Sequence, residues 1–223
     1  MKLHAIKNLQ HLQVCLQMLF FMINFVAILM QTLINLLNSE CDSHLPNEVW
    51  QEFFALAEEV HYKRNQTIIA PYDIDRNLYI LKEGIVKVIE VNNGVERVTG
   101  FGLPGSIYKC SLSFCKGLPT GIEMVACKPT VMLRIPYESF WEMARRSHAF
   151  AIFMLGYTMA EQCEIQLKET QIHNKSLEER YQEVLQYRPW IAREIPDYVL
   201  ASYLGVTPEH FSRMKSNFLK SKS

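Results

Sequence analysis

The chain lacks an excess of charge of either sign. Its 223 residues hold 23 Lys and Arg against 23 Asp and Glu, so the formal net charge is zero. That balance argues against a uniformly basic coat for nucleic acid, but a local basic patch remains compatible with it. A charged fraction of 21% and a hydrophobic fraction of 49% are typical of a globular protein. The length suits one large domain or two small ones.

Signatures of catalysis and of metal binding are also missing. There is no Ser/His/Asp order with a nucleophile elbow, no HExxH and no phosphate-binding P-loop, so we predict that the chain is not an enzyme. The six cysteines form no CxxC pair, and Cys110 and Cys115 have no histidine nearby. We expect no metal and no cofactor. A reduced, cytoplasmic location explains the free cysteines best.

A long uninterrupted apolar run is absent as well. Residues 14–37 are mostly apolar, but the run is broken at Gln17, Asn24, Gln31 and Asn35. A bilayer-spanning helix needs about 20 apolar residues, and no small-x-small cleavage site follows. Three interpretations of residues 1–29 stay open. We favour an extension that arises from a misplaced start codon over a packed or membrane-surface helix and over a membrane anchor.

The remaining chain changes its hydrophobic period in an orderly way. Leu45 to Val60 has helical spacing, and from His61 the period falls to two. Turn signals separate six predicted strands, at residues 66–70, 77–84, 85–91, 96–102, 121–126 and 130–136. The Asn-Gly at 93–94 favours a tight hairpin. Many short strands at this spacing predict a small antiparallel barrel or roll, followed by helices over 137–146 and 148–171.

The second of these helices carries a heptad-like stripe. Its members are spaced alternately by four and three residues: Ala149, Phe153, Gly156, Ala160, Cys163 and Leu167. Ile152, Leu155 and Met159 form a neighbouring stripe. Two stripes need two partners, so we predict that one packs on the chain's own β domain and the other on a second subunit. The predicted dimerisation residues are Phe153, Gly156, Ala160, Cys163 and Leu167. The alternative is a core helix buried within one chain.

The stretch DYVLASYLGVTPEHFSRMKSNF, residues 197–218, predicts two short helices broken by a tight turn. Gly205 can adopt a positive φ at little cost, Thr207 suits an N-cap, and Pro208 suits the first helical turn. This is the spacing of a helix-turn-helix, whose second helix enters the DNA major groove. An ordinary helical hairpin is the alternative.

The chain beyond Glu209 is basic and suited to DNA. It holds Arg213, Lys215, Lys220 and Lys222 and no acidic residue, which favours contact with phosphates. An arginine can bond guanine O6 and N7 with both arms of its guanidinium, and a glutamate can accept from cytosine N4. Arg213 and Glu209 therefore fit base contacts.

A roll, a long helix and a helix-turn-helix, in this order, resemble the Crp/Fnr family, the cyclic-AMP receptor protein and its relatives. The resemblance covers about residues 31–220 and is carried by NLYILKEGIVKVIEV, TVMLRIPYESFWEM and IPDYVLASYLGVTPEHFSRM. The last segment is especially similar to short regulators of this family from Bacteroidetes-type bacteria.

The resemblance implies an α+β fold. An N-terminal antiparallel β-roll, a cyclic-nucleotide-binding-like jelly roll with flanking helices, would precede a long dimerisation helix and a winged-helix-like helix-turn-helix domain. The expected divisions are an extension at 1–29, the roll at 30–147, the dimerisation helix at 148–174 and the DNA-binding domain at 175–223.

The implied function is sequence-specific transcription regulation by a homodimer. Its partners would be double-stranded DNA and RNA polymerase. Glu209 and Arg213 match the residues that the family directs at base edges. The full set of expected DNA contacts is Thr207, Glu209, His210, Ser212, Arg213 and Ser216.

The sensor half departs from the family's cyclic-nucleotide binders in PGSIYKCSLSFCKGLPTGIEMVA. Cys110 stands where the family has a ribose-binding glutamate, and Thr120 and Gly121 replace an Arg-Ser pair. Without the arginine, no fixed fork of donors balances a buried phosphate. We expect a degenerate effector pocket at Cys110, Thr120 and Gly121, with an unknown small-molecule effector that is not cyclic AMP. The alternative function is a cyclic-nucleotide-binding-like sensory module that acts through protein contacts, at a membrane in one version.

Overall fold

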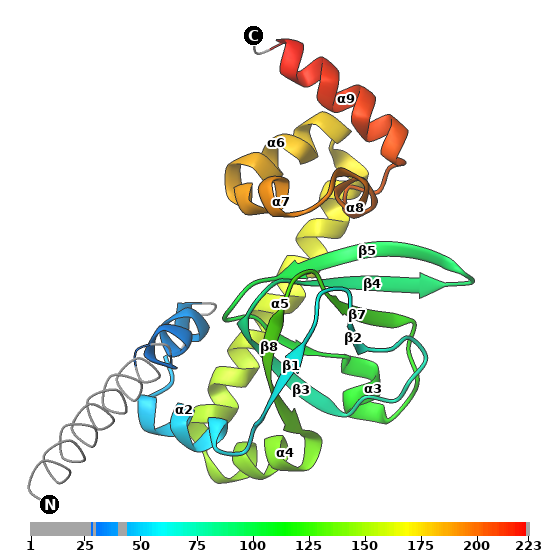
Figure 1. Cartoon of the computed structure of the whole chain (residues 1–223). Coiled ribbons are helices and arrows are strands. Elements are labelled where there is room, and N and C mark those ends of the chain that lie inside the picture. The colour runs from blue at the N-terminus through cyan, green and yellow to red at the C-terminus, as the bar shows by residue number, and fades with distance from the viewer. Residues whose placement is uncertain (1–27, 29, 40–43, 222–223) are drawn as a thin grey trace, which may run out of the picture.

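The computed structural model describes residues 28, 30–39 and 44–221. Except for residue 28, the predicted extension 1–29 lies outside these residues. Residues 30–39 are helical, and α2 (Asn47–Phe54) follows. Figure 1 shows a β-roll at one end, a group of short helices at the other, and the long helix α5 (His148–Asn174) running between them. None of the helices in the described part of the chain is long and apolar enough to cross a membrane.

The roll consists of two four-stranded sheets whose neighbouring strands are all antiparallel. Their strand orders are β1-β8-β3-β6 and β2-β7-β4-β5. The strands are β1 (Glu58–Tyr62), β2 (Thr67–Ile69), β3 (Asn77–Glu83), β4 (Val86–Asn92), β5 (Val95–Gly102), β6 (Ile107–Lys109), β7 (Ile122–Ala126) and β8 (Thr130–Pro136). The predicted antiparallel roll with flanking helices is confirmed.

The hairpin between β4 and β5 forms where the Asn-Gly pair predicts it. Asn92 pairs with Val95, and the two residues between them have positive φ, 50° at Asn93 and 78° at Gly94. Two consecutive positive φ values are typical of the primed turns whose twist matches the flanking strands. Local sequence is therefore sufficient to specify this turn.

The predicted helix 45–60 was wrong in its second half. The helix ends at Phe54, and residues 58–62 form β1, which pairs with β8 from Glu58 opposite Arg134 to Tyr62 opposite Thr130. An ion pair between Arg134 and Glu58, 2.5 Å long, lies across this pairing. Tertiary pairing with a distant strand outweighs the helical spacing at this point. The three-residue strand β6 was not predicted either, because it is too short to show a period.

The first turns of α5 pack in the hydrophobic core between the helices and one face of the sheet β1-β8-β3-β6. Phe150 and Phe153 pack against α2, with ring centroids 4.4 Å apart for Phe53 and Phe150 and 5.0 Å for Trp50 and Phe153. The Trp50 indole N–H donates to Asn38 Oδ1 at 3.0 Å, so this buried polar group is satisfied. The helix α4 (Tyr137–Arg146) and residues 30–39 close the same core.

The four C-terminal helices form a unit that we call the head. They are α6 (Leu177–Tyr187), α7 (Pro189–Glu194), α8 (Asp197–Tyr203) and α9 (Pro208–Ser221). A capping box between Ser176 and Glu179 begins α6. Tyr181 packs edge-on against Phe211 and Phe218, at centroid distances of 5.3 and 5.5 Å.

No strand lies in the described residues of the head, 175–221, so the winged part of the predicted winged-helix-like domain was wrong for these residues. The chain between α6 and α8 forms the short helix α7 instead of strands. Pro189 occupies the first turn of α7, where its missing N–H costs no hydrogen bond. The head is therefore wholly helical as far as it is described.

The head and the roll share one hydrophobic core. Phe101 of β5 packs against Trp190 and Tyr203 of the head, at centroid distances of 6.2 and 5.1 Å. Because β5 is an edge strand, its outer N–H groups need partners. The Val98 N–H finds one in the Ser202 hydroxyl of α8, 3.0 Å away. The head is thus docked along the edge of the roll.

Candidate functional site

The turn between α8 and α9 has the geometry that its sequence predicts. Gly205 has a φ of 76°, and the N–H of Val206 reaches back to the Ala201 carbonyl at 3.0 Å. Thr207 Oγ1 accepts the N–H of His210 at 3.3 Å, which makes Thr207 the N-cap of α9. The positive φ at Gly205 and the cap at Thr207 are confirmed. The turn fixes the angle at which α9 leaves α8.

The outer face of α9 carries the residues that the sequence singles out. All six side chains expected to contact DNA are exposed: Thr207, Glu209, His210, Ser212, Arg213 and Ser216. On the opposite face Phe211 is fully buried and Phe218 nearly so, and both hold the helix to the head. The structure therefore leaves all six side chains open to solvent, from Thr207 before the helix to Ser216 past its middle.

A carboxylate and a guanidinium lie one helical turn apart on that surface. The pKa of Glu209 is lowered, first by a hydrogen bond from its own backbone N–H, then by the Thr207 hydroxyl and by the positive charge of Arg213. Glu209 is therefore ionised and acts as an acceptor, beside a permanent donor fork at Arg213. Such a pair can bond to cytosine and guanine edges in the major groove.

The other basic residues of the C-terminal segment differ in how far their charges are free to contact DNA. Lys215 is half-buried and bonds to the Asp197 carboxylate at 2.8 and 2.9 Å, so it ties α9 to the first turn of α8. Lys220 is exposed in the last turn of α9. Lys222 lies outside the described residues. Arg213 and Lys220 are thus cations that the described part of α9 offers to solvent.

The stripes on α5 are arranged differently from the prediction. Phe153 is only 1% exposed because its ring fills the aromatic core beside Trp50, so its assignment to the dimer contact was wrong. Gly156 and Ala160 are half-buried, and Cys163 and Leu167 are exposed. The exposed apolar stripe consists of Ile152, Leu155 and Met159, at 46%, 58% and 62%. A bulky aromatic ring fits the core between the helices and the sheet, and this packing turns the second stripe towards solvent.

The three residues of the expected effector pocket lie close together. Cys110 Sγ is 2.8 Å from Thr120 Oγ1. The Thr120 carbonyl accepts the N–H of Tyr72, and the Gly121 carbonyl accepts the N–H of Val91, both at 2.6 Å. A Cβ at Gly121 would collide with the Val91 carbonyl. This loop is therefore held on both sides by the chain's own hydrogen bonds.

An ion pair that the sequence did not reveal lies next to this loop. Lys109, in β6, bonds to Glu161 of α5 at 2.8 Å, and its side chain is only 11% exposed. Nearby, Tyr157 of α5 accepts the N–H of Ile107 through its hydroxyl at 3.0 Å. Both contacts join residues more than 45 positions apart, so only the folded chain shows them. They fasten α5 to the strand that leads into the loop.

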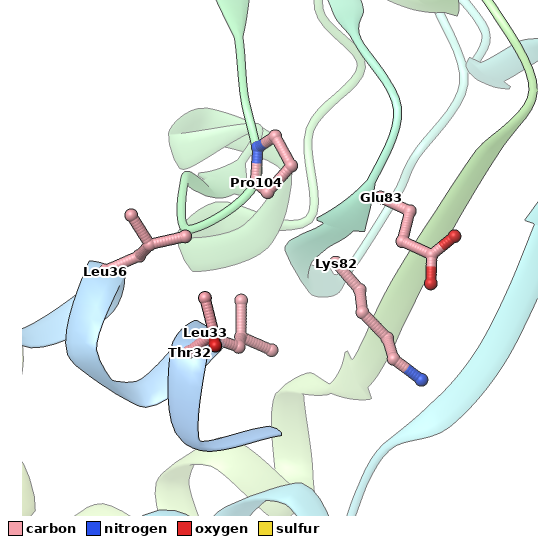
Figure 2. A pocket seen from close by; sticks show the side chains of 6 residues that line it. All are labelled: Thr32, Leu33, Leu36, Lys82, Glu83 and Pro104. Atoms are coloured by element: carbon pink, nitrogen blue, oxygen red, sulfur yellow. The ribbon is translucent and has the colours of Figure 1, made fainter. Parts of the chain in front are cut away.

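Figure 2 shows a pocket on another side of the roll, lined by Thr32, Leu33, Leu36, Lys82, Glu83 and Pro104. Its volume is about 70 Å³, well below the several hundred that a small-molecule site usually has. The Lys82 ammonium bonds to Glu59 at 2.5 Å and is not available to a ligand. Among the described residues no three His, Cys, Asp or Glu side chains come together as a metal site.

The roll is similar in sequence to a known domain family. Residues 59–147 match the cyclic nucleotide-binding domain family. This match runs from β1 to the residue after α4 and contains the loop with Cys110, Thr120 and Gly121. No curated protein matches the chain.

Solved structures share the fold well beyond the roll. FixK2 from Bradyrhizobium japonicum is 19% identical, with 74% of this chain and 86% of that one covered at a TM-score of 0.62. The c-di-GMP responsive global regulator CLP of Xanthomonas campestris is 16% identical, with 79% and 93% covered at 0.62. The catabolite activator protein of Thermus thermophilus is 19% identical, with 80% and 85% covered at 0.52. At these identities the likeness shows the fold, which is that of Crp/Fnr-type regulators.

Proposed function

We propose that the chain is a sequence-specific, DNA-binding transcription regulator of the Crp/Fnr type. The observation that carries the proposal is the exposed face of α9, where Glu209 and Arg213 stand one turn apart at the start of a helix. The second helix of a helix-turn-helix presents its N-terminal residues to base edges, and α9 follows α8 through such a turn. Thr207, His210, Ser212 and Ser216 would add contacts to bases and phosphates.

The regulator would act as a homodimer in the cytoplasm. The exposed stripe of Ile152, Leu155 and Met159 supports this, because these three side chains are large, apolar and turned away from the chain's own core. Gly156, Ala160, Cys163 and Leu167 would lie at the margins of the contact. Pairing of two α5 helices would set two α9 helices about one DNA turn (~34 Å) apart, on a pseudo-palindromic site.

The roll would sense an effector other than cyclic AMP, or serve as a scaffold. Residues 59–147 match a cyclic-nucleotide domain, yet Thr120 and Gly121 offer no guanidinium to a cyclic phosphate. The half-buried cation next to this loop, Lys109, is already paired with Glu161. Contact with RNA polymerase belongs to the same proposal and rests on the family resemblance alone.

A pull-down of bound genomic DNA from the native host, followed by titration of the recovered site, tests this function. A regulator should recover a small set of sites, and its log affinity for them should fall linearly with log salt. Random recovery with a shallow salt slope would reject the proposal. It would favour the alternative, in which the roll acts as a sensory module through protein contacts.

A further inference from the structure

The head has two kinds of contact with the rest of the chain, and they differ in strength. One is with α5, where Arg188, between α6 and α7, bonds to Glu164 at 3.3 Å. Both side chains are exposed, at 46% and 69%, and an exposed ion pair contributes little to stability. Residues 162–167 of α5 are all exposed, so this part of the helix buries little surface against the head.

The other contact is with the edge of the roll, and it is buried. Val98 of β5, only 6% exposed, donates its N–H to Ser202 Oγ of α8 at 3.0 Å. Leu200 and Ala201 of the same helix are fully buried in the cluster that contains Val98. Burial of apolar side chains stabilises a contact far more than an exposed ion pair does. The head is therefore held by β5 more firmly than by α5.

A β-bulge at Thr99 shapes this contact. In the pairing of β4 with β5, Val88 lies opposite Gly100 and Ile89 opposite Val98, so Thr99 is an extra residue in the ladder. Side chains alternate along a strand, and an extra residue shifts the alternation by one position. Val98 and Phe101, three positions apart, therefore both face the head, and both pack in its buried cluster.

We propose that the edge of β5, and not the direct contact with α5, fixes the position of α9 in the dimer and so sets the spacing of half-sites that the regulator accepts. This inference rests on the proposed function. Ser202 and Phe101 are then positioning residues. The rigid path runs from the α5 stripe through the core around Phe150 and Phe153, along β5 to α8, and across the turn at Gly205 to α9. Figure 1 shows α8 lying along β5.

Half-site spacing reports on this contact because DNA is helical. One added base pair moves a half-site by about 3.4 Å and turns it by about 34°. A head docked on β5 cannot follow this change, so both half-sites are filled only when one head leaves the edge of the roll. The affinity then falls by the fraction of molecules in that arrangement. The preference for the native spacing therefore measures the strength of docking.

The test compares affinities for the recovered DNA site and for versions with one base pair added or removed between the half-sites. Full-length wild type should bind the altered sites at least about tenfold more weakly, since each lost base contact costs about that factor. Ser202→Ala removes the hydrogen bond to Val98 and leaves the buried cluster in place. Such a bond contributes a factor of about two to ten, so the preference should fall by that factor. Glu164→Gln breaks the exposed ion pair and should change the preference by less than about twofold.

The matched control is Ser106→Ala. Ser106 Oγ also accepts a backbone N–H, that of Leu103 at 3.3 Å, but this bond lies within the roll. The control should keep the preference of wild type. A second variant, Phe101→Leu, shortens the ring contacts with Trp190 and Tyr203 and should lower the preference as Ser202→Ala does.

The outcomes separate this inference from the function on which it rests. A wild type that accepts all spacings equally, or a Ser202→Ala preference equal to that of wild type, overturns the role of β5 and leaves DNA binding intact. A fall with Glu164→Gln alone would assign the positioning to α5, and an equal fall with Ser106→Ala would assign it to general loosening of the roll. Absence of salt-dependent DNA binding in the wild type overturns both inference and function. Equal affinity of all variants for a single half-site, with unchanged circular dichroism, checks that the head itself is intact.

Discussion

Replacement of Gly205 by valine tests the turn on which the DNA-binding proposal depends. Gly205 has a φ of 76°, in the left-handed region that L-residues avoid. Space is not the obstacle, because among the described residues the one heavy atom near an added Cβ is Arg180 Nη1, at 3.7 Å, an ordinary contact. The effect of the substitution should therefore come from backbone conformation alone.

The magnitude follows from two opposing contributions. A left-handed conformation costs a non-glycine residue roughly 1–2 kcal/mol, and a β-branched side chain lies at the upper end. Removal of glycine also stabilises by about 0.4–1 kcal/mol, because the unfolded chain loses freedom. We therefore expect Gly205→Val to lower the free energy of unfolding by about 1–1.5 kcal/mol. Gly205→Asn should lower it less, since asparagine tolerates this region.

Urea titration followed by circular dichroism gives the measurement. With a slope of about 3 kcal/mol per molar, the midpoint of Gly205→Val should fall by about 0.4 M. Gly100→Val is the control, because Gly100 lies in β5 without a positive φ and with no described atom within 4 Å of an added Cβ. A midpoint for Gly205→Val equal to that of wild type would refute the argument that this turn needs glycine.

Three further predictions concern the proposed contacts. Arg213→Ala should weaken binding to the recovered DNA site by about 1–3 kcal/mol and relax discrimination at one base pair per half-site, whereas an affinity and a discrimination equal to those of wild type would exclude a base contact. Leu155→Asp with Met159→Asp should convert a dimer into monomers in sedimentation experiments, and a wild type that is monomeric at micromolar concentration would contradict the proposed α5 pairing. Cyclic AMP at millimolar concentration should leave the melting temperature unchanged, because the loop from Cys110 to Gly121 contains no arginine that could bind its phosphate. A ligand at 100 times its dissociation constant would add about 2.7 kcal/mol, which a melting curve would reveal.

The features that local sequence determines were predictable. The Asn-Gly hairpin, the glycine turn at 205 and the cap at Thr207 each depend on the conformational preference of one or two residues, and all three form. Helix α4 begins and ends as its spacing predicts, at Tyr137 and Arg146.

The features that the sequence did not predict depend on contacts with residues far along the chain. Residues 58–60 have a helical pattern, but pairing with β8 makes them part of strand β1. The heptad spacing of Phe153 does not indicate that its ring packs in the aromatic core beside Trp50. The pairing of Lys109 with Glu161 joins two different elements, and nothing in a single segment indicates it.

The docking of α8 along β5 bears on how this protein unfolds. Ile85, Ile89, Val98 and Val125 of the roll belong to the same buried cluster as the helices of the head. If the head came away, this apolar surface and the unpaired outer edge of β5 would face water together, as an aggregation-prone strand edge. We therefore expect roll and head to melt in one cooperative transition. Proteolysis or mutation that frees the head should lead to aggregation of the roll.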